Sequence, residues 1–265
     1  MKMDIFSGPC VLESEELANE VCHFLVESLA PYKDKIELHF KGSFDKANRS
    51  AIDSYRGPGL EKGLQILEGI SKKYGVKTIT DFHTPDQAME VASVVHTLQV
   101  PAFLCRQTDM ILAGAEACKK YDGQLKVKKG QFLAPWDAQN IVDKALNYLP
   151  KDKILLTERG TSFGYNNMVV DMASFEIMKS FGVRAIHDAT HSVQKPGGLG
   201  KATDGKREQI MTLALAAAAA GADGFFMEAH PNPSKALSDA TSQLQMQEVP
   251  KLVAKILKVK DALNA

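Results

Sequence analysis

Along its whole length the chain alternates between short runs of β-branched or aliphatic residues and longer amphipathic segments. Between most of these runs the apolar residues recur at helical spacing, as in residues 15–28 and 60–74. Eight runs predict β-strands: 3–6, 36–40, 77–80, 94–98, 125–127, 154–156, 184–186 and 224–227. Strands that alternate with helices favour an α/β fold, and eight such units favour a (β/α)8, or TIM, barrel over an open doubly wound sheet.

The size of the chain agrees with one domain of this kind. It has 265 residues, and a (β/α)8 barrel typically needs about 250. No linker, internal repeat or low-complexity segment divides the sequence. We therefore expect residues 1–265 to form a single barrel domain.

Composition excludes several classes of protein. The 32 Lys and Arg residues balance 32 Asp and Glu residues, whereas a general nucleic-acid binder needs a basic surplus. The four cysteines lack CxxC spacing and are expected to be reduced thiols. No apolar run reaches the roughly 18 residues of a membrane helix, and no signal-peptide core follows the N-terminus. We expect a cytoplasmic protein that contacts neither nucleic acid nor membrane.

Polar clusters follow almost every predicted strand, at the point where the strand ends. Because the carboxyl ends of all the strands of a parallel barrel meet on one rim, and barrel active sites lie on that rim, one composite site is expected there. The clusters occupy residues 8–10, 41–43, 81–83, 106–109, 128–131, 158–159, 188–191 and 228–230.

The expected rim is strongly cationic although the whole chain has no formal net charge. Cations gathered at one mouth suit a substrate with several negative charges, such as phosphates and carboxylates. The simpler alternative is that each one is an ordinary surface charge. The cations are Lys41, Lys46, Arg49, Arg106, Lys128 and Arg159.

Two further patterns need care. Residues 160–164 match the GxSxG pattern of a hydrolase, but a nucleophile elbow needs a strand before Ser162 and a helix after it. The flanking residues predict a loop, so we reject the hydrolase interpretation.

Possible metal ligands show no local spacing typical of a metal site, and spacing alone does not establish one. They are Cys10, His83, His191, Glu228, His230 and Asp239.

Nine stretches, in order and spanning nearly the whole chain, together resemble the 3-deoxy-D-manno-octulosonate 8-phosphate (Kdo-8-phosphate) synthases. The resemblance implies a (β/α)8-barrel transferase of lipopolysaccharide precursor synthesis. Such an enzyme joins phosphoenolpyruvate to D-arabinose 5-phosphate and releases inorganic phosphate. The stretches are GPCVLES (8–14), KGSFDKANRS (41–50), YRGPGLEKG (55–63), TDFHTPDQ (80–87), PAFLCRQTD (101–109), VKKGQFLAPWD (127–137), TERGTSFGYNNMVVDM (157–172), DATHSVQKPGG (188–198) and EAHPNPSKALSDA (228–240).

The resemblance also implies roles for individual residues. The carboxylate end of phosphoenolpyruvate would be bound by Lys41, Ser43, Lys46 and Gln131. Its phosphate would be surrounded by Arg106, Lys128, Arg159 and His191. The sugar phosphate would be bound by Asn48, Arg49 and Ser50, with Asp81 near the sugar hydroxyls. The catalytic group among these is Lys41, Lys46, Lys128, Arg159 and His191. The family is commonly homotetrameric, and Arg49 would complete the sugar site of a neighbouring subunit.

The resembled family has a metal-dependent and a metal-independent class, which differ by Cys or Asn in the first βα turn. This chain has Cys10 there, and His191, Glu228 and Asp239 match the remaining ligands. The resemblance therefore implies the metal-dependent class. The mixed ligand set suits Zn²⁺, Fe²⁺ or Mn²⁺ without choosing among them.

Two alternatives remain open. The first is a 3-deoxy-arabino-heptulosonate 7-phosphate synthase, which shares the barrel and phosphoenolpyruvate but acts on erythrose 4-phosphate. Members of that family have the motif Lys-Pro-Arg-Thr in the second βα loop, whereas residues 46–50 of this chain are KANRS. The second is a non-catalytic barrel that binds a sugar phosphate, which would not need the Cys, His, Glu and Asp set.

Overall fold

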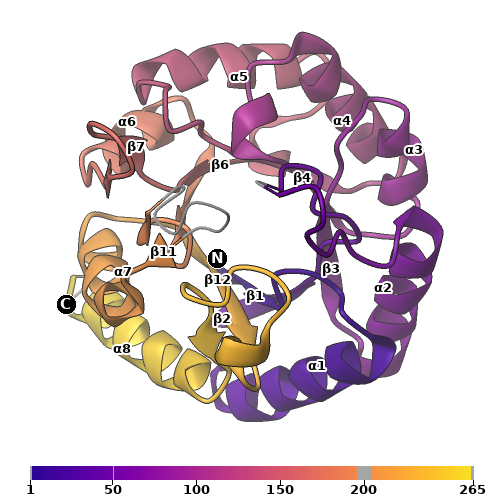
Figure 1. Ribbon diagram of the computed structural model, residues 1–265. Coiled ribbons are helices and arrows are strands. Elements are labelled where there is room, and N and C mark those ends of the chain that lie inside the picture. Colours follow the sequence, from indigo (N-terminus) through magenta and orange to yellow (C-terminus); the bar gives the residue numbers. More distant parts are fainter. Residues whose placement is uncertain (1, 50, 196–203, 264–265) are drawn as a thin grey trace.

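The computed structural model describes residues 2–49, 51–195 and 204–263 and contains a closed parallel barrel. Strand β1 pairs with both β2 and β12, so the sheet has no free edge (Figure 1). The predicted (β/α)8 fold is confirmed. The barrel strands are β1 (Met3–Gly8), β2 (Ile36–Lys41), β3 (Lys77–Asp81), β4 (Thr97–Val100), β5 (Gln124–Lys128), β6 (Ile154–Glu158), β9 (Arg184–Asp188) and β12 (Gly224–His230).

All eight predicted strands exist, and only β4 is displaced appreciably. The prediction placed it at 94–98, but the structure has it at Thr97–Val100. The amide of Val95 still donates to the carbonyl of Val91, which continues the turn that ends the preceding helix. Apolar character alone does not reveal where such a turn stops, because Val94 and Val95 suit either structure.

A ring of helices surrounds the barrel (Figure 1). The first helix begins where Ser14 accepts a hydrogen bond from the Leu17 amide at 3.1 Å, an N-cap. The second ends at Gly75, whose φ of 65° closes a left-handed C-cap. The helices are α1 (Glu15–Leu29), α2 (Leu60–Tyr74), α3 (Gln87–Ala92), α4 (Thr108–Lys120), α5 (Gln139–Ala145), α6 (Ser174–Ser180), α7 (Ile210–Ala219) and α8 (Glu248–Leu263).

Short strands lie outside the barrel order, and one pair decides the GxSxG question. Ser162 lies in β7 (Thr161–Ser162), which pairs antiparallel with β8 (Met168–Val169). No helix follows the serine directly, so this is not a nucleophile elbow. The remaining short strands are β10 (Gln194–Lys195), β11 (Asp204–Gly205) and β13 (Leu244–Gln245). No helix in the described ranges has the length and apolar character of a bilayer span.

Inward-facing side chains fill the barrel in layers, because alternate residues of each strand point inside. At the amino-terminal end a ring of polar groups is linked by hydrogen bonds: Asp4, His39, Thr97, Gln124 and Arg184. Above it lies an apolar layer: Phe6, Ile79, Leu155, Ile186 and Phe226. The carboxyl end of the strands carries the polar layer that includes Lys41, Asp81, Lys128, Asp188 and Glu228. The two lower layers close the barrel and leave only its carboxyl end for chemistry.

One buried histidine predicts acid sensitivity. The ring of His187 packs edge-on against Phe175 and Phe225, and neither ring nitrogen has a hydrogen-bond partner among the described residues. Burial lowers the pKa of His187 from 6.5 to about 4. The unfolded chain therefore binds more protons than the folded chain between these values, and stability falls as the pH drops through this window.

We expect His187→Leu to lose part of this acid sensitivity. Between about pH 7 and pH 5 the wild-type protein should lose roughly 2 kcal/mol of unfolding free energy more than the variant does. Urea unfolding of both proteins at the two pH values measures the difference. Equal losses in both proteins would show that His187 does not titrate in this range.

Candidate active site

A cavity of about 440 Å³ opens at the carboxyl end of the strands. Most of the residues predicted from the sequence line it, contributed by strands and loops from 41 to 239 along the chain. The barrel therefore brings together side chains that are remote in sequence, as the position of the polar clusters predicted. Predicted residues that line the cavity are Lys41, Ser43, Lys46, Asn48, Arg49, Asp81, Lys128, Gln131, Arg159, His191, Glu228 and Asp239.

Two predicted residues are not in that lining, and a third lies outside the described residues. Cys10 is buried beside the cavity, next to Asp239. Arg106 follows the short 3₁₀ turn at Ala102–Leu104, is exposed, and does not line the cavity of its own chain. Ser50 lies outside the described residues.

A buried ion pair forms one wall of the cavity. The Nζ of Lys41 donates to Glu228 Oε1 at 2.5 Å and to the carbonyl of Cys10 at 2.5 Å. Both side chains are about 1% exposed. Burial raises the pKa of Glu228, but Lys41 and His191 lower it by more, so the carboxylate stays ionised. Lys41 thus ties the loop that carries Cys10 to the end of β12.

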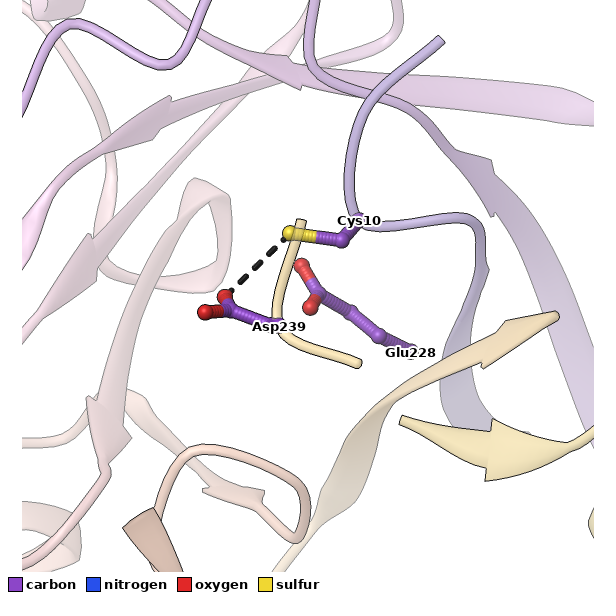
Figure 2. Close-up of side chains that lie close together, drawn as sticks. All are labelled: Cys10, Glu228 and Asp239. Carbon is purple, nitrogen blue, oxygen red and sulfur yellow. Dashed lines mark hydrogen bonds between the residues drawn. The ribbon is translucent and has the colours of Figure 1, made fainter. Parts of the chain in front are cut away.

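Three potential metal ligands meet beside this pair. One ligand atom each from Cys10, Glu228 and Asp239 lies within 4.8 Å of the other two (Figure 2). The Cys10 thiol donates to Asp239 Oδ2 at 3.3 Å, and its sulfur also lies 3.2 Å from Ser238 Oγ. The buried Glu228 Oε2 accepts no hydrogen bond from any described residue. An unpartnered carboxylate oxygen here is an open coordination group.

His191 faces the same cluster from β9 and the loop that follows it. Its Nε2 lies 3.6 Å from Glu228 Oε2 and 3.6 Å from Asp239 Oδ2. Its Nδ1 lies 3.0 Å from Asp188 Oδ2, and an Nδ1–H bond to that carboxylate leaves the Nε2 lone pair towards the cluster. This arrangement is common for metal-binding histidines. The sequence placed Asp188 in the polar cluster at residues 188–191 of the expected rim but assigned no role to it.

The donor set fits a divalent transition-metal ion. One thiol, one imidazole and two carboxylates match the ligands of Zn²⁺, Fe²⁺ or Mn²⁺. Burial, together with Asp239 and Glu228, raises the pKa of the Cys10 thiol. Without a cation the sulfur therefore keeps its proton and donates it to Asp239, and a bound metal ion would replace that proton.

The opposite side of the cavity is cationic. Arg159 is buried, donates to Gln194 Oε1 at 3.0 Å and to the sulfur of Met168 at 2.8 Å, and forms no ion pair with any described residue. Lys128 Nζ donates to Asp188 Oδ2 at 2.7 Å. Burial lowers the pKa of both groups, more strongly than nearby carboxylates raise it. A buried guanidinium without a carboxylate suits an anionic ligand.

Lys46 lies between the two regions. Its Nζ is 3.5 Å from the carbonyl of Cys10. Burial lowers the pKa of Lys46, but the acidic groups around it, among them the carboxylates of Glu228, Asp81 and Asp239, raise it by more, so the ammonium stays charged. The cavity therefore offers a fixed positive charge to a ligand that extends from the metal cluster to Arg159.

Further polar groups line the cavity near β3. Ser43 Oγ donates to Asp81 Oδ1 at 2.5 Å, and the other oxygen of Asp81 lies 3.1 Å from His83 Nε2. Arg49 donates to Ser238 Oγ at 2.7 Å and to the carbonyl of Leu237 at 3.1 Å. Arg49 thus lies at the cavity of its own chain. The expectation that it serves a neighbouring subunit stays a prediction.

Several lining residues escaped the sequence prediction. Gln99 precedes the end of β4, Gln194 contacts Arg159, and Ser238 contacts both Cys10 and Arg49. Gln99 had a detectable signal, because it alternates with Thr97 on an inward-facing strand. Gln194 and Ser238 lie within two of the stretches that carry the resemblance, but no role was assigned to either.

The fold and the site together define a (β/α)8-barrel enzyme whose cavity joins a cationic region to a cluster of metal-binding side chains. The chain belongs to the DAHP synthetase I family, whose model matches residues 1–265.

Three named proteins are similar to this chain over most of its length. The chain is 50% identical over 249 residues to the 2-dehydro-3-deoxyphosphooctonate aldolase of Protochlamydia amoebophila, covering 94% of this chain and 88% of the relative. It is 51% identical over 249 residues to the protein of that name from Fusobacterium nucleatum, covering 94% and 87%. It is 49% identical over 260 residues to the one from Desulfotalea psychrophila, covering 98% and 90%.

Proposed function

We propose that this protein is a 3-deoxy-8-phosphooctulonate synthase, a transferase of Kdo biosynthesis. It condenses phosphoenolpyruvate with D-arabinose 5-phosphate and water, giving 3-deoxy-D-manno-octulosonate 8-phosphate and inorganic phosphate. The observation that carries the proposal is one cavity in which buried Arg159 and Lys128 face the Cys10, His191, Glu228 and Asp239 cluster. The names of the relatives favour this activity over the heptulosonate alternative.

The cationic region has the chemistry that phosphoenolpyruvate requires. Lys128 and Arg159 bind its phosphate, and Lys41 and Lys46 hold its carboxylate end together with Ser43 and Gln131. These contacts place C3 of phosphoenolpyruvate against the aldehyde carbon of the sugar. Holding two reactants in attack geometry removes much of the entropic barrier of a bimolecular step.

Bond changes then follow in order. C3 forms the new carbon–carbon bond with the aldehyde carbon, water adds at C2, and the C2–O bond to phosphate breaks. Arg159 and Lys128 offset the charge of the phosphate as it leaves. Asp81 lies near the sugar hydroxyls, while Asn48, Arg49 and Ser50 bind the sugar phosphate.

The proposal includes a divalent metal ion held by Cys10, His191, Glu228 and Asp239. When bound, such an ion supplies Lewis-acid polarisation to a coordinated oxygen. Asp188 orients the His191 ring, and Lys41 balances the charge of Glu228. We further propose a cytoplasmic homotetramer in which a neighbouring subunit completes the sugar site, which the resemblance supports.

Phosphate release tests the activity. The metal-supplemented protein should release inorganic phosphate from phosphoenolpyruvate only when an aldose phosphate is present, with arabinose 5-phosphate preferred to erythrose 4-phosphate. Preference for erythrose 4-phosphate would support the heptulosonate alternative. No release with either sugar, from protein that is folded and contains metal, would support a binding protein without catalysis.

Arg49→Ala should mainly raise the KM for arabinose 5-phosphate. Loss of a charge-assisted contact of about 1.5–3 kcal/mol predicts a fall in kcat/KM of roughly tenfold to a hundredfold. Arg56→Ala is a matched control, because exposed Arg56 lies near the same loop and pairs with Asp45. Weakened phosphoenolpyruvate binding with normal sugar kinetics would contradict the assignment of Arg49.

A further inference from the structure

One lysine inside the barrel has no counter-ion. Lys126 faces inward on β5, between Gln124 of the lowest ring and Lys128 of the cavity, and its side chain is completely buried. It forms no ion pair with any described residue. Instead its Nζ lies 4.6 Å from the ring centroid of Phe226 and 5.3 Å from that of Phe6. A buried amine in this setting needs an explanation, because burial of an unpaired cation is costly.

Among the described residues Lys126 makes one polar contact, and this contact leads to the cavity. Its Nζ donates to Oε1 of Gln99 at 2.9 Å. The parallel register makes this contact possible, because Gln99 on β4 pairs with Lys126 on one side and with Asp81 on the other. Gln99 lines the cavity.

This contact settles which way the Gln99 amide faces. A lysine side chain only donates, so the group opposite it must be the amide oxygen. The NH₂ of Gln99 then lies at the other end of the amide and donates to no described residue. In the reversed orientation the amide would turn its oxygen towards the cavity and repel an anionic ligand.

We propose that Lys126 is a positioning residue for phosphoenolpyruvate, holding the Gln99 amide so that its NH₂ donates to an anionic oxygen of the substrate. The inference rests on the proposed function. Among the cavity cations Lys128 is near, since it follows Lys126 by two residues on the same face of β5. Gln99 and Lys128 line the same cavity, so the phosphate assigned to Lys128 is the acceptor that we infer for the Gln99 amide.

The surroundings of Lys126 oppose and support its charge in different ways. Burial lowers the pKa of Lys126 well below the usual value, and the neighbouring cation Lys128 lowers it further. The faces of the Phe6 and Phe226 rings and the Gln99 oxygen stabilise its ammonium form.

Lys126→Met tests the inference, because methionine has a similar length and no donor. The KM for phosphoenolpyruvate, and its dissociation constant by calorimetry, should rise about tenfold, the loss expected for one hydrogen bond to a charged group. We expect kcat and the KM for the sugar to change less than about twofold. The melting temperature should stay equal or rise, because an apolar side chain replaces an unpaired buried amine. Affinity loss without loss of stability is not the signature of a merely structural residue.

The double variant shows whether Lys126 acts through Gln99. Gln99→Leu alone should also raise the KM for phosphoenolpyruvate about tenfold, and adding Lys126→Met to it should cause no further loss, because both changes remove one contact. Independent losses that multiply to about a hundredfold would overturn the proposal, as would normal phosphoenolpyruvate binding in Lys126→Met. Gln124→Met is a matched control: it removes a buried polar group two residues away in the ring below, and should lower stability without changing the KM.

Failure of this inference differs from failure of the proposed function. If the wild-type protein releases no phosphate but binds phosphoenolpyruvate, the synthase assignment is wrong. Calorimetry of phosphoenolpyruvate binding then still tests the role of Lys126. If the wild-type protein is active and Lys126→Met binds phosphoenolpyruvate normally, only the role of Lys126 falls.

Discussion

Exhaustive chelation should abolish phosphate release by this protein, and adding back Zn²⁺, Fe²⁺ or Mn²⁺ should restore it. The expectation follows from three ligand groups within 4.8 Å of one another, from the His191 Nε2 3.6 Å from two of them, and from the Oε2 of buried Glu228, which accepts no hydrogen bond from the described residues. A thiolate holds such ions well, whereas Mg²⁺ and Ca²⁺ prefer oxygen ligands and should restore little activity. Measuring the metal content and the activity of the same samples tests whether activity requires the metal ion. Full activity with metal confirmed near zero would show that Cys10 is an ordinary thiol, and the synthase assignment would survive.

Variants at Cys10 test the metal requirement by changing a proposed ligand instead of removing the metal ion with a chelator. Cys10→Ser should weaken metal retention and lose activity in proportion. Cys10→Asn should keep partial activity that no longer responds to a chelator, because the resembled metal-independent class has Asn at this position. Cys22→Ser is the control, since Cys22 is also a buried thiol but lies on α1 away from the cluster. Equal metal loss in Cys22→Ser would indicate general destabilisation.

Replacing either buried cation of the phosphate region should slow turnover even at saturating substrate. Removing a group that offsets charge in the reaction typically costs a factor of about 10²–10³ in kcat, and we expect this for Arg159→Ala and Lys128→Ala. Steady-state kinetics at saturating concentrations of both substrates measures the loss.

The two variants should differ in stability, which provides an internal control. Arg159 forms no ion pair with described residues, so its loss should change the melting temperature little. Lys128→Ala removes a partner of buried Asp188 and should lower the melting temperature as well. An effect confined to thermal stability in both variants would show that these cations are structural. Lys72→Ala on the exposed face of α2 should change neither property.

The positions of the predicted strands show how far local sequence carries the fold. A strand of apolar residues bounded by polar clusters can be predicted from its own segment of sequence, and so can a helix whose apolar residues recur at helical spacing. Strand β4 was displaced because Val94 and Val95 suit both a turn and a strand. The rule that barrel active sites lie at the carboxyl ends of strands then predicted most of the cavity.

Contacts between remote segments were beyond that reasoning. Arg106 follows a strand end like the other cations, yet it is exposed and does not line the cavity of its own chain. Gln194 and Ser238 reach the site through loops whose path depends on tertiary packing. The contact of Lys126 with Gln99 depends on the pairing of β4 with β5.

By itself the sequence determined the order of the elements, the barrel class and the set of polar residues at its rim. These properties depend on periodicity and on residues close along the chain, so they can be read without coordinates. Only the tertiary structure decided that Cys10 meets Asp239, 229 positions away, and that His191 aims its Nε2 at both carboxylates. Such distances follow from the closure of β1 against β12, which joins the two ends of the chain and places Cys10 beside a cavity lined by loops from remote segments.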